Sequence, residues 1–161
     1  MSVIYLKIDG VKGSVTRDRY KDYIKVFNLH YPIPGNNSGA MGTVHGLDPS
    51  RRRYAQFNIV HEADTSETDI LKLSQPDKTV KEMEAVFLNS DQNDALVNRK
   101  LLFKNCVISD IVPVDMGENA TGLQYRVSYT QFELTRQCYD KENKPLSQKV
   151  AKYDVEKGIW S

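Results

Sequence analysis

The chain has 161 residues, and its 22 basic and 21 acidic side chains leave a formal net charge of only +1 at pH 7. This balance gives no field strong enough to make nucleic acid or an anionic membrane the main partner, but it permits self-association. A mass of 18.4 kDa is enough for one core of ordinary size. Because no change in composition marks a boundary, we expect a single domain over residues 1–161.

The first thirty residues predict two β-strands. Residues of the first strand alternate between a drier face, made by Ile4, Leu6 and Ile8, and a second face made by Val3, Tyr5 and Lys7. The second strand has one bulkier and more apolar face, which we expect to join the core: Tyr23, Lys25, Phe27, Leu29 and Tyr31. This choice leaves Asn28 and His30 on the exposed face.

A long loop over residues 31–53 follows the second strand. About twenty residues without secondary structure are unusual in a compact domain, and such segments are commonly functional. The loop carries more apolar surface than a solvated linker needs, and docking on another subunit would bury it. The candidate contact residues are Tyr31, Ile33, Asn37, Met41, Val44 and Leu47.

The rest of the chain predicts one short helix among further strands. Residues 54–60 alternate as a third strand, and residues 64–74 read as a helix capped by Thr65 or Ser66 and closed by Pro76. Further strands are expected at 80–88, 100–111, 122–139 and 149–155, with a bulge or bend at Thr130 and Gln131. These elements predict a mainly β fold: a small β-barrel of two packed sheets with one short α-helix and a long extended loop.

No constellation in the sequence supports catalysis. His30, His45 and His61 stand on separate elements without metal-ligand spacing, so we interpret them as surface or interface histidines. The glycines of residues 35–46 are not followed by the Gly-Lys-Ser/Thr of a phosphate loop. Cys106 and Cys138 lie in apolar stretches and predict reduced core thiols. We expect no enzyme activity, no cofactor and no metal.

The opening of the chain resembles the Hcp proteins, the tube subunits of bacterial type VI secretion systems. Members typically begin with a strand of the form I-x-L-K-I-x-G-I-K-G-E-S and then carry D-W-I-E-V. The counterparts here run from Ile4 to Ser14 and from Asp22 to Val26, with Tyr23 in place of the usual Trp. The Gly/Asn/Ser-rich loop is also similar, and the resemblance is most specific over residues 3–74.

The resemblance implies a structural role. Six copies would form a ring, and rings would stack into a tube that lies inside a sheath, carries a spike and holds small effector proteins in its lumen. In the family, the position of His30 looks toward the channel, which makes Asn28 and His30 the candidate lumen residues. No apolar run approaches the roughly eighteen residues of a membrane helix, and the N-terminus has no signal-peptide pattern. We therefore expect synthesis in the cytoplasm, no membrane insertion, and secretion through the type VI apparatus.

Two alternatives remain open at this stage. A tail-tube protein of a contractile phage-like particle shares the same β-barrel plan, and a stand-alone β-barrel binding domain would act as a monomer. The native mass separates the monomer from the ring, and neighbouring genes for sheath and spike proteins would separate the two kinds of tube.

Overall fold

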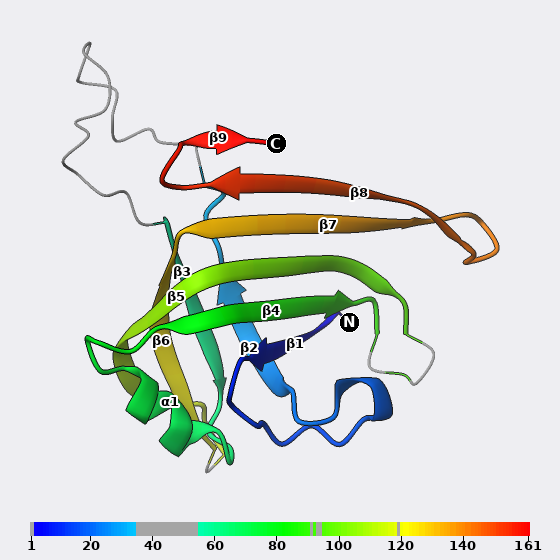
Figure 1. The fold of residues 1–161 in the computed structure, drawn as a ribbon. Coiled ribbons are helices and arrows are strands. Elements are labelled where there is room, and N and C mark those ends of the chain that lie inside the picture. Colours follow the sequence, from blue (N-terminus) through cyan, green and yellow to red (C-terminus); the bar gives the residue numbers. More distant parts are fainter. Residues whose placement is uncertain (1, 35–54, 91, 93–94, 119) are drawn as a thin grey trace.

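The computed structural model describes residues 2–34, 55–90, 92, 95–118 and 120–161. In these parts the chain forms the following elements: β1 (Val3–Ile8), the 3₁₀ helix η1 (Asp18–Tyr20), β2 (Ile24–His30), β3 (Ala55–Glu62), α1 (Glu67–Leu73), β4 (Val80–Leu88), β5 (Val97–Asp115), β6 (Thr121–Tyr129), β7 (Gln131–Tyr139), β8 (Pro145–Asp154) and β9 (Ile159–Trp160). The elements and their places are labelled in Figure 1.

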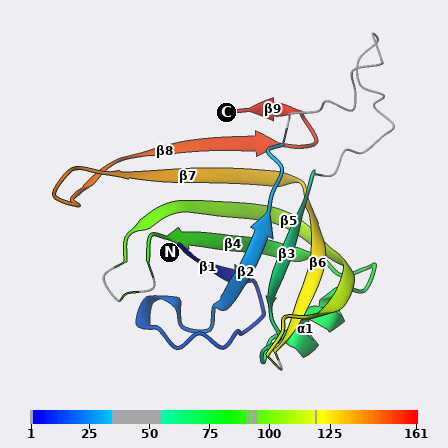
Figure 2. The ribbon, with the colours of Figure 1, turned by 180° about the vertical axis from the view of Figure 1, so that it is seen from behind.

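Six strands close into a barrel, as the sequence predicts. Their order is β4-β1-β2-β3-β6-β5, and the additional pairing of β4 with β5 joins the two ends. The closure depends on the length of β5, whose first half pairs with β4 and whose second half pairs with β6. Closure leaves these strands without free edges. Figure 2 shows β2, β3 and β6 as the wall on the side away from β4 and β5.

The predicted bend at Thr130 is confirmed, and it redirects the chain out of the barrel. Before it, Tyr129 ends β6 beside Ala55 of β3. After it, β7 keeps pairing with β5 but takes β8 as its second neighbour. Asn105 of β5 adopts a φ of 55°, and its side-chain amide donates to the Thr130 hydroxyl at 3.0 Å. Both strands of this pair therefore bend at the same level.

The barrel interior is filled by one apolar cluster. Phe57 stacks on Phe103 with ring centroids 4.1 Å apart, and Tyr129 lies 4.9 Å from the same Phe103 ring. Helix α1 contributes Ile70, which is fully buried. A second, smaller cluster covers the outer side of β1, where Tyr5 stacks on Tyr20. β1 is therefore buried on both faces apart from residues such as the exposed Lys7.

The prediction for the core face of β2 is wrong. Ile24, Val26 and Leu29 are buried, whereas Phe27 is 74% exposed. The register against β3 shifts between Val26 and Asn28. A bulge of this kind adds one residue and reverses the alternation of faces, so the inward positions pass from even to odd numbers. Asn28 remains exposed on the outer side of this shift.

Helix α1 lies where the sequence places it, but its start is held differently. The Ser66 side chain makes no capping hydrogen bond. Instead the Asp64 carboxylate accepts from the Ser66 backbone N–H at 2.8 Å and from the Ser66 hydroxyl. β8 begins earlier than expected, and β9 was not predicted. Both strands are largely exposed and so lack the apolar alternation that reveals a strand in sequence.

Candidate functional site

A polar surface covers the outer side of β2, β3 and β6. The pairing register places His30 beside Asn58 and Asn58 beside Arg126. Asn28 lies in the next row, beside Val60. We call this surface the polar wall, and it consists of Asn28, His30, Gln56, Asn58, Gln124, Arg126 and Ser128. The structure thus brings both candidate lumen residues onto one sheet face.

Strict alternation explains why the polar wall exists. On β3 the residues between its polar positions, Phe57 and Ile59, are almost completely buried, and Tyr125 and Val127 alternate in the same way on β6. Within the wall, the Gln56 side-chain amide donates to the Ser128 hydroxyl at 3.3 Å. The wall therefore presents amides, a hydroxyl and an imidazole over a rigid barrel, and these groups can hydrogen-bond a polar partner.

His61 lies inside the barrel, so its interpretation as a surface or interface residue is wrong. Its Nδ1 lies 2.9 Å from the Glu62 carbonyl oxygen and therefore carries the proton. Its Nε2, 2.9 Å from the Tyr125 hydroxyl, accepts the hydroxyl proton. Burial lowers the pKa of His61 and raises the pKa of Tyr125. The alternation of Phe57, Ile59 and His61 was the signal in the sequence that placed this side chain inward.

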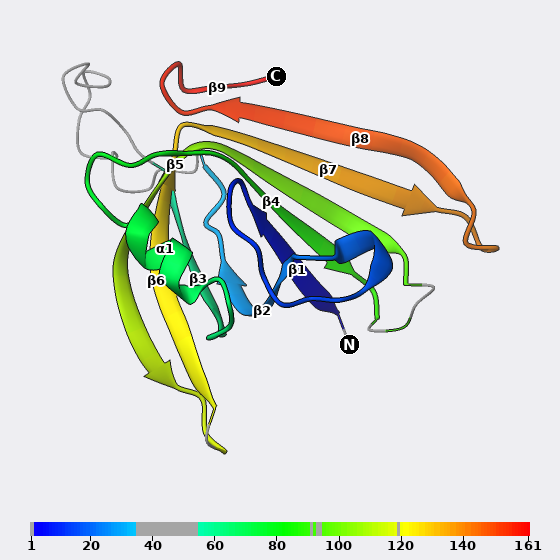
Figure 3. The ribbon, with the colours of Figure 1, turned by 60° about the horizontal axis from the view of Figure 1, so that its bottom comes forward.

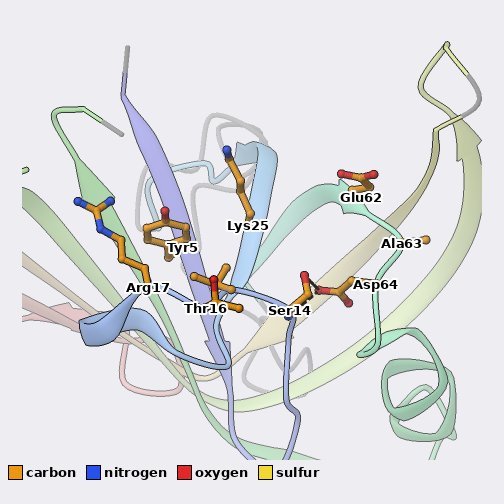
Figure 4. Close-up of a pocket in the computed structure, with 9 residues that line it drawn as sticks. Tyr5, Ser14, Thr16, Arg17, Lys25, Glu62, Ala63 and Asp64 are labelled. Atoms are coloured by element: carbon orange, nitrogen blue, oxygen red, sulfur yellow. Dashed lines mark hydrogen bonds between the residues drawn. The ribbon is translucent and has the colours of Figure 1, made fainter. Parts of the chain in front are cut away.

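A polar groove of about 570 Å³ lies between the segment after β1 and the end of β3. Figure 4 shows Tyr5, Arg17 and Lys25 on one side and Ser14, Glu62 and Asp64 on the other. The Asp64 carboxylate accepts from the Ser14 backbone N–H and hydroxyl, both at 3.2 Å. Sequence reasoning missed this groove because residues 62–64 are far in the sequence from the other lining residues, 5–25, and only the folded barrel joins them.

The loop candidates divide between described and undescribed residues. Asn37, Met41, Val44 and Leu47 lie outside the described residues, as do His45 and the arginines 51–53. Tyr31 contacts its own chain: it accepts a hydrogen bond from Arg99, and its ring meets Phe87 edge-on at 5.9 Å. Ile33 is 50% exposed.

The cysteines are both free thiols. Cys106 is buried in the core, as predicted, and burial raises the pKa of its thiol to about 12. Cys138 is only partly buried, on β7 outside the barrel, which differs from the predicted core position. Among the described residues, no three His, Cys, Asp or Glu side chains gather as metal ligands. Within the same residues, no helix has the length and apolar character needed to cross a membrane.

Comparison with known proteins identifies the family. Residues 5–136 match the family model described as type VI secretion system effector, Hcp. No curated protein sequence matches the chain. Among solved structures, Hcp1 from Salmonella typhimurium aligns over 100% of both chains with a TM-score of 0.74 and 18% identity. A structure described as a type six secretion system protein also aligns over 100% of both, with a TM-score of 0.80 and 14% identity.

A third similar structure is a type VI secretion system effector from Yersinia pestis, with a TM-score of 0.68 and 18% identity. That alignment covers 94% of this chain and 98% of the Yersinia chain. At these identities the structures establish the shared fold, and the family model covers most of the chain. The chain therefore belongs to the Hcp family of type VI secretion proteins.

Proposed function

We propose that this protein is the structural subunit of a type VI secretion inner tube. Six copies form a ring, rings stack into a tube, and the tube carries small effector proteins in its lumen. The subunit is made in the cytoplasm and leaves through the secretion apparatus, where sheath and spike proteins are its further partners. It performs no catalysis in this role. The observation that carries the proposal is the strand pair that leaves the closed barrel.

This strand pair offers both backbone and side chains to a neighbour. β8 pairs with β7 along its length, but on its other side the described residues pair only with Lys152, Tyr153 and Asp154, through β9 and Ser161. An open sheet edge is a ready template for association. Large apolar side chains are also exposed here, including Leu146 at 52%, Val150 at 48% and Ile159 at 56%. Association would cover this surface, which a monomer leaves in water.

We assign the polar wall to the lumen side of the ring. A lumen that releases its cargo needs a mainly polar surface, and the wall consists of amides, a hydroxyl, an imidazole and one arginine, with the partly buried Val60 between Asn28 and Gln124. Arg126 lies 3.4 Å from Asp110, which offsets its charge. Asn28 and His30 are exposed at one end of this wall.

The native mass tests the ring. We expect the purified protein to have a mass of about 110 kDa at micromolar concentration, six times the 18.4 kDa of one chain. Rings should also be visible by negative-stain electron microscopy. A monodisperse monomer would overturn the proposal and favour a stand-alone binding domain. Neighbouring genes for sheath and spike proteins would distinguish the type VI tube from a phage-like tail tube.

Substitution of His30 tests the lumen. His30→Glu places six like charges around the channel while the barrel and the ring remain intact. We expect the amount of effector that co-purifies with the ring to change, whereas the neutral control His30→Gln retains effector as the wild type does. Equal retention by both variants would remove His30 from the lumen surface.

A further inference from the structure

Three cations form a straight row across β5, β7 and β8. The register places Arg99 directly opposite Arg136, and Arg136 directly opposite Lys149. Residues that pair in this way share one face of the sheet, with Cβ atoms about 5 Å apart. It is the same face on which Leu101 and Phe103 enter the core. Like charges placed directly opposite destabilise a sheet, so this row needs a compensating partner.

Within the described part of the chain, the compensation does not come from carboxylates. Arg99 is fixed by its hydrogen bond to Tyr31 and lies over the Phe87 ring at 5.8 Å. Arg136 and Lys149 are exposed, and no described carboxylate forms an ion pair with them. On the opposite face of the same strands, Lys104 lies 4.0 Å from Glu82, and Lys152 lies 4.0 Å from Glu133. Two cations of that opposite face thus have a carboxylate partner, whereas exposed Lys100 has none among the described residues.

The strands that carry the row extend beyond the barrel. β7 pairs with β5 as far as Arg136, and from there it pairs only with β8. We call residues 136–149 the ribbon, and Figures 1 and 3 show it reaching away from the body of the molecule. A two-stranded hairpin is at best marginally stable in water without a further packing surface. The length and exposure of the ribbon thus indicate contact with another molecule.

The groove between β1 and β3 has the complementary features. Glu62 is exposed at its edge, and the adjoining first turn of α1 carries Glu67 and Asp69. None of these three carboxylates forms an ion pair with a described cation. Arg17 and Lys25 also line the groove. The carboxylates available to a cationic partner therefore lie at the groove edge, at Glu62 and on the first turn of α1.

We propose that the ribbon of one copy docks in the groove of the neighbouring copy, with the row of Arg136 and Lys149 against Glu62 and Glu67. The ribbon tip and α1 lie at opposite ends of the molecule in Figure 3, so the contact is head-to-tail and repeats around a ring. This inference rests on the proposed ring and specifies its subunit contact.

Charge reversal tests the contact from either side. Arg136→Glu with Lys149→Glu reverses the ribbon, and Glu62→Lys with Glu67→Lys reverses the groove. We expect each pair to raise the protein concentration at half-assembly at least tenfold, measured by native mass or analytical ultracentrifugation. Lys12→Glu with Lys157→Glu makes the same change in net charge as the ribbon reversal, at two exposed residues outside the strands, and should assemble as the wild type does. Circular dichroism checks that each variant folds.

Mixing the two reversed variants gives the decisive result. In the mixture, the negative ribbon of the first variant meets the positive groove of the second. The unchanged positive ribbon of the second variant meets the unchanged negative groove of the first. Each variant repels itself but attracts the other, so an equimolar mixture should regain a mass of about 110 kDa, six chains of 18.4 kDa, with the variants alternating.

The outcomes separate the two proposals. If the wild type is a monomer, the ring fails. If the wild type forms rings, three results would each refute the docking while leaving the ring in place. They are normal assembly of either reversed variant, equal impairment of the control, and a mixture that stays dissociated. Testing both sides guards against a ribbon variant that does not fold.

Discussion

Two buried tyrosines on β6 differ in a way that predicts opposite effects of the same substitution. Tyr125 donates its hydroxyl to His61 Nε2 at 2.9 Å, and both side chains are almost fully buried. Tyr129, four residues later on the same strand, is also fully buried, but its hydroxyl has no hydrogen-bond partner among the described residues. Tyr125→Phe and Tyr129→Phe each remove one oxygen atom, so their changes in packing volume are matched.

The change in unfolding free energy depends on which polar group remains buried and unpaired after each hydroxyl is removed. Tyr125→Phe leaves the His61 Nε2 acceptor buried and unsatisfied, which costs about 1–3 kcal/mol of unfolding free energy. For a chain of this size, 1 kcal/mol corresponds to about 2–4 °C in the melting temperature. Tyr129→Phe removes a hydroxyl that is already unsatisfied, so we expect it to be neutral or to stabilise by up to about 1 kcal/mol.

Urea denaturation measures the difference. The fluorescence of Trp160, which packs 4.9 Å from the Tyr153 ring, provides a signal, and far-UV circular dichroism provides a second one. All proteins are compared at one concentration, because the proposed self-association would add a concentration-dependent term to the apparent stability. A loss for Tyr129→Phe as large as that for Tyr125→Phe would refute the reasoning, because packing rather than the hydrogen bond would then account for both.

Three further predictions concern the barrel and its thiols. Because the pKa of His61 is lowered in the folded chain, the unfolded chain binds a proton at a higher pH than the folded chain does. The free energy of unfolding should therefore fall as the pH drops from about 6.5, the ordinary histidine pKa, toward the lowered pKa of the folded state. In urea titrations across this range, His61→Gln should lose less stability than the wild type on acidification, and parallel curves would contradict the assignment. Cys138 should react with a maleimide in the native protein at pH 8 while Cys106 stays protected by burial and a pKa of about 12, and label that persists in Cys138→Ser would contradict this. Gly13→Ala should destabilise by about 1–3 kcal/mol, since the added Cβ would lie 2.3 Å from the Tyr23 carbonyl oxygen, and a thermal melt unchanged from the wild type would show that the loop relaxes freely.

The sequence predicted those elements whose pattern depends on local alternation. β3, β4 and the bend at Thr130 were recognisable because one face of each strand is buried in the same barrel. The same logic failed at β2, since the bulge between Val26 and Asn28 depends on pairing with β3 and leaves no mark in the sequence. It failed again at β8, where ten residues form a strand with almost no buried face.

The candidate site was likewise predictable only where local alternation determines it. Asn28 and His30 were predicted to be exposed, and they are, although the strand face assumed to be buried was the wrong one. The rest of the polar wall comes from β3 and β6, and only the register places those residues beside His30. The row of Arg99, Arg136 and Lys149 was not predictable, because its members are separated by 37 and 13 positions in the sequence and meet only through strand pairing.

The bend at Thr130 links the fold to the proposed assembly. A barrel closed by β1 to β6 hides its strand edges, so these strands have no backbone edge to offer a second copy. If β6 had continued straight, its pairing with β3 would have kept the chain within the barrel wall. Instead, pairing with β3 ends at Tyr129, and the chain continues as β7, which still pairs with β5. The core therefore supports the base of the ribbon through Phe132, which is buried beside Phe103, and its far end remains free. In the proposed ring, folding stability and association would depend on different parts of the same β-hairpin, so charge reversal at Arg136 and Lys149 should impair the ring while leaving the barrel intact.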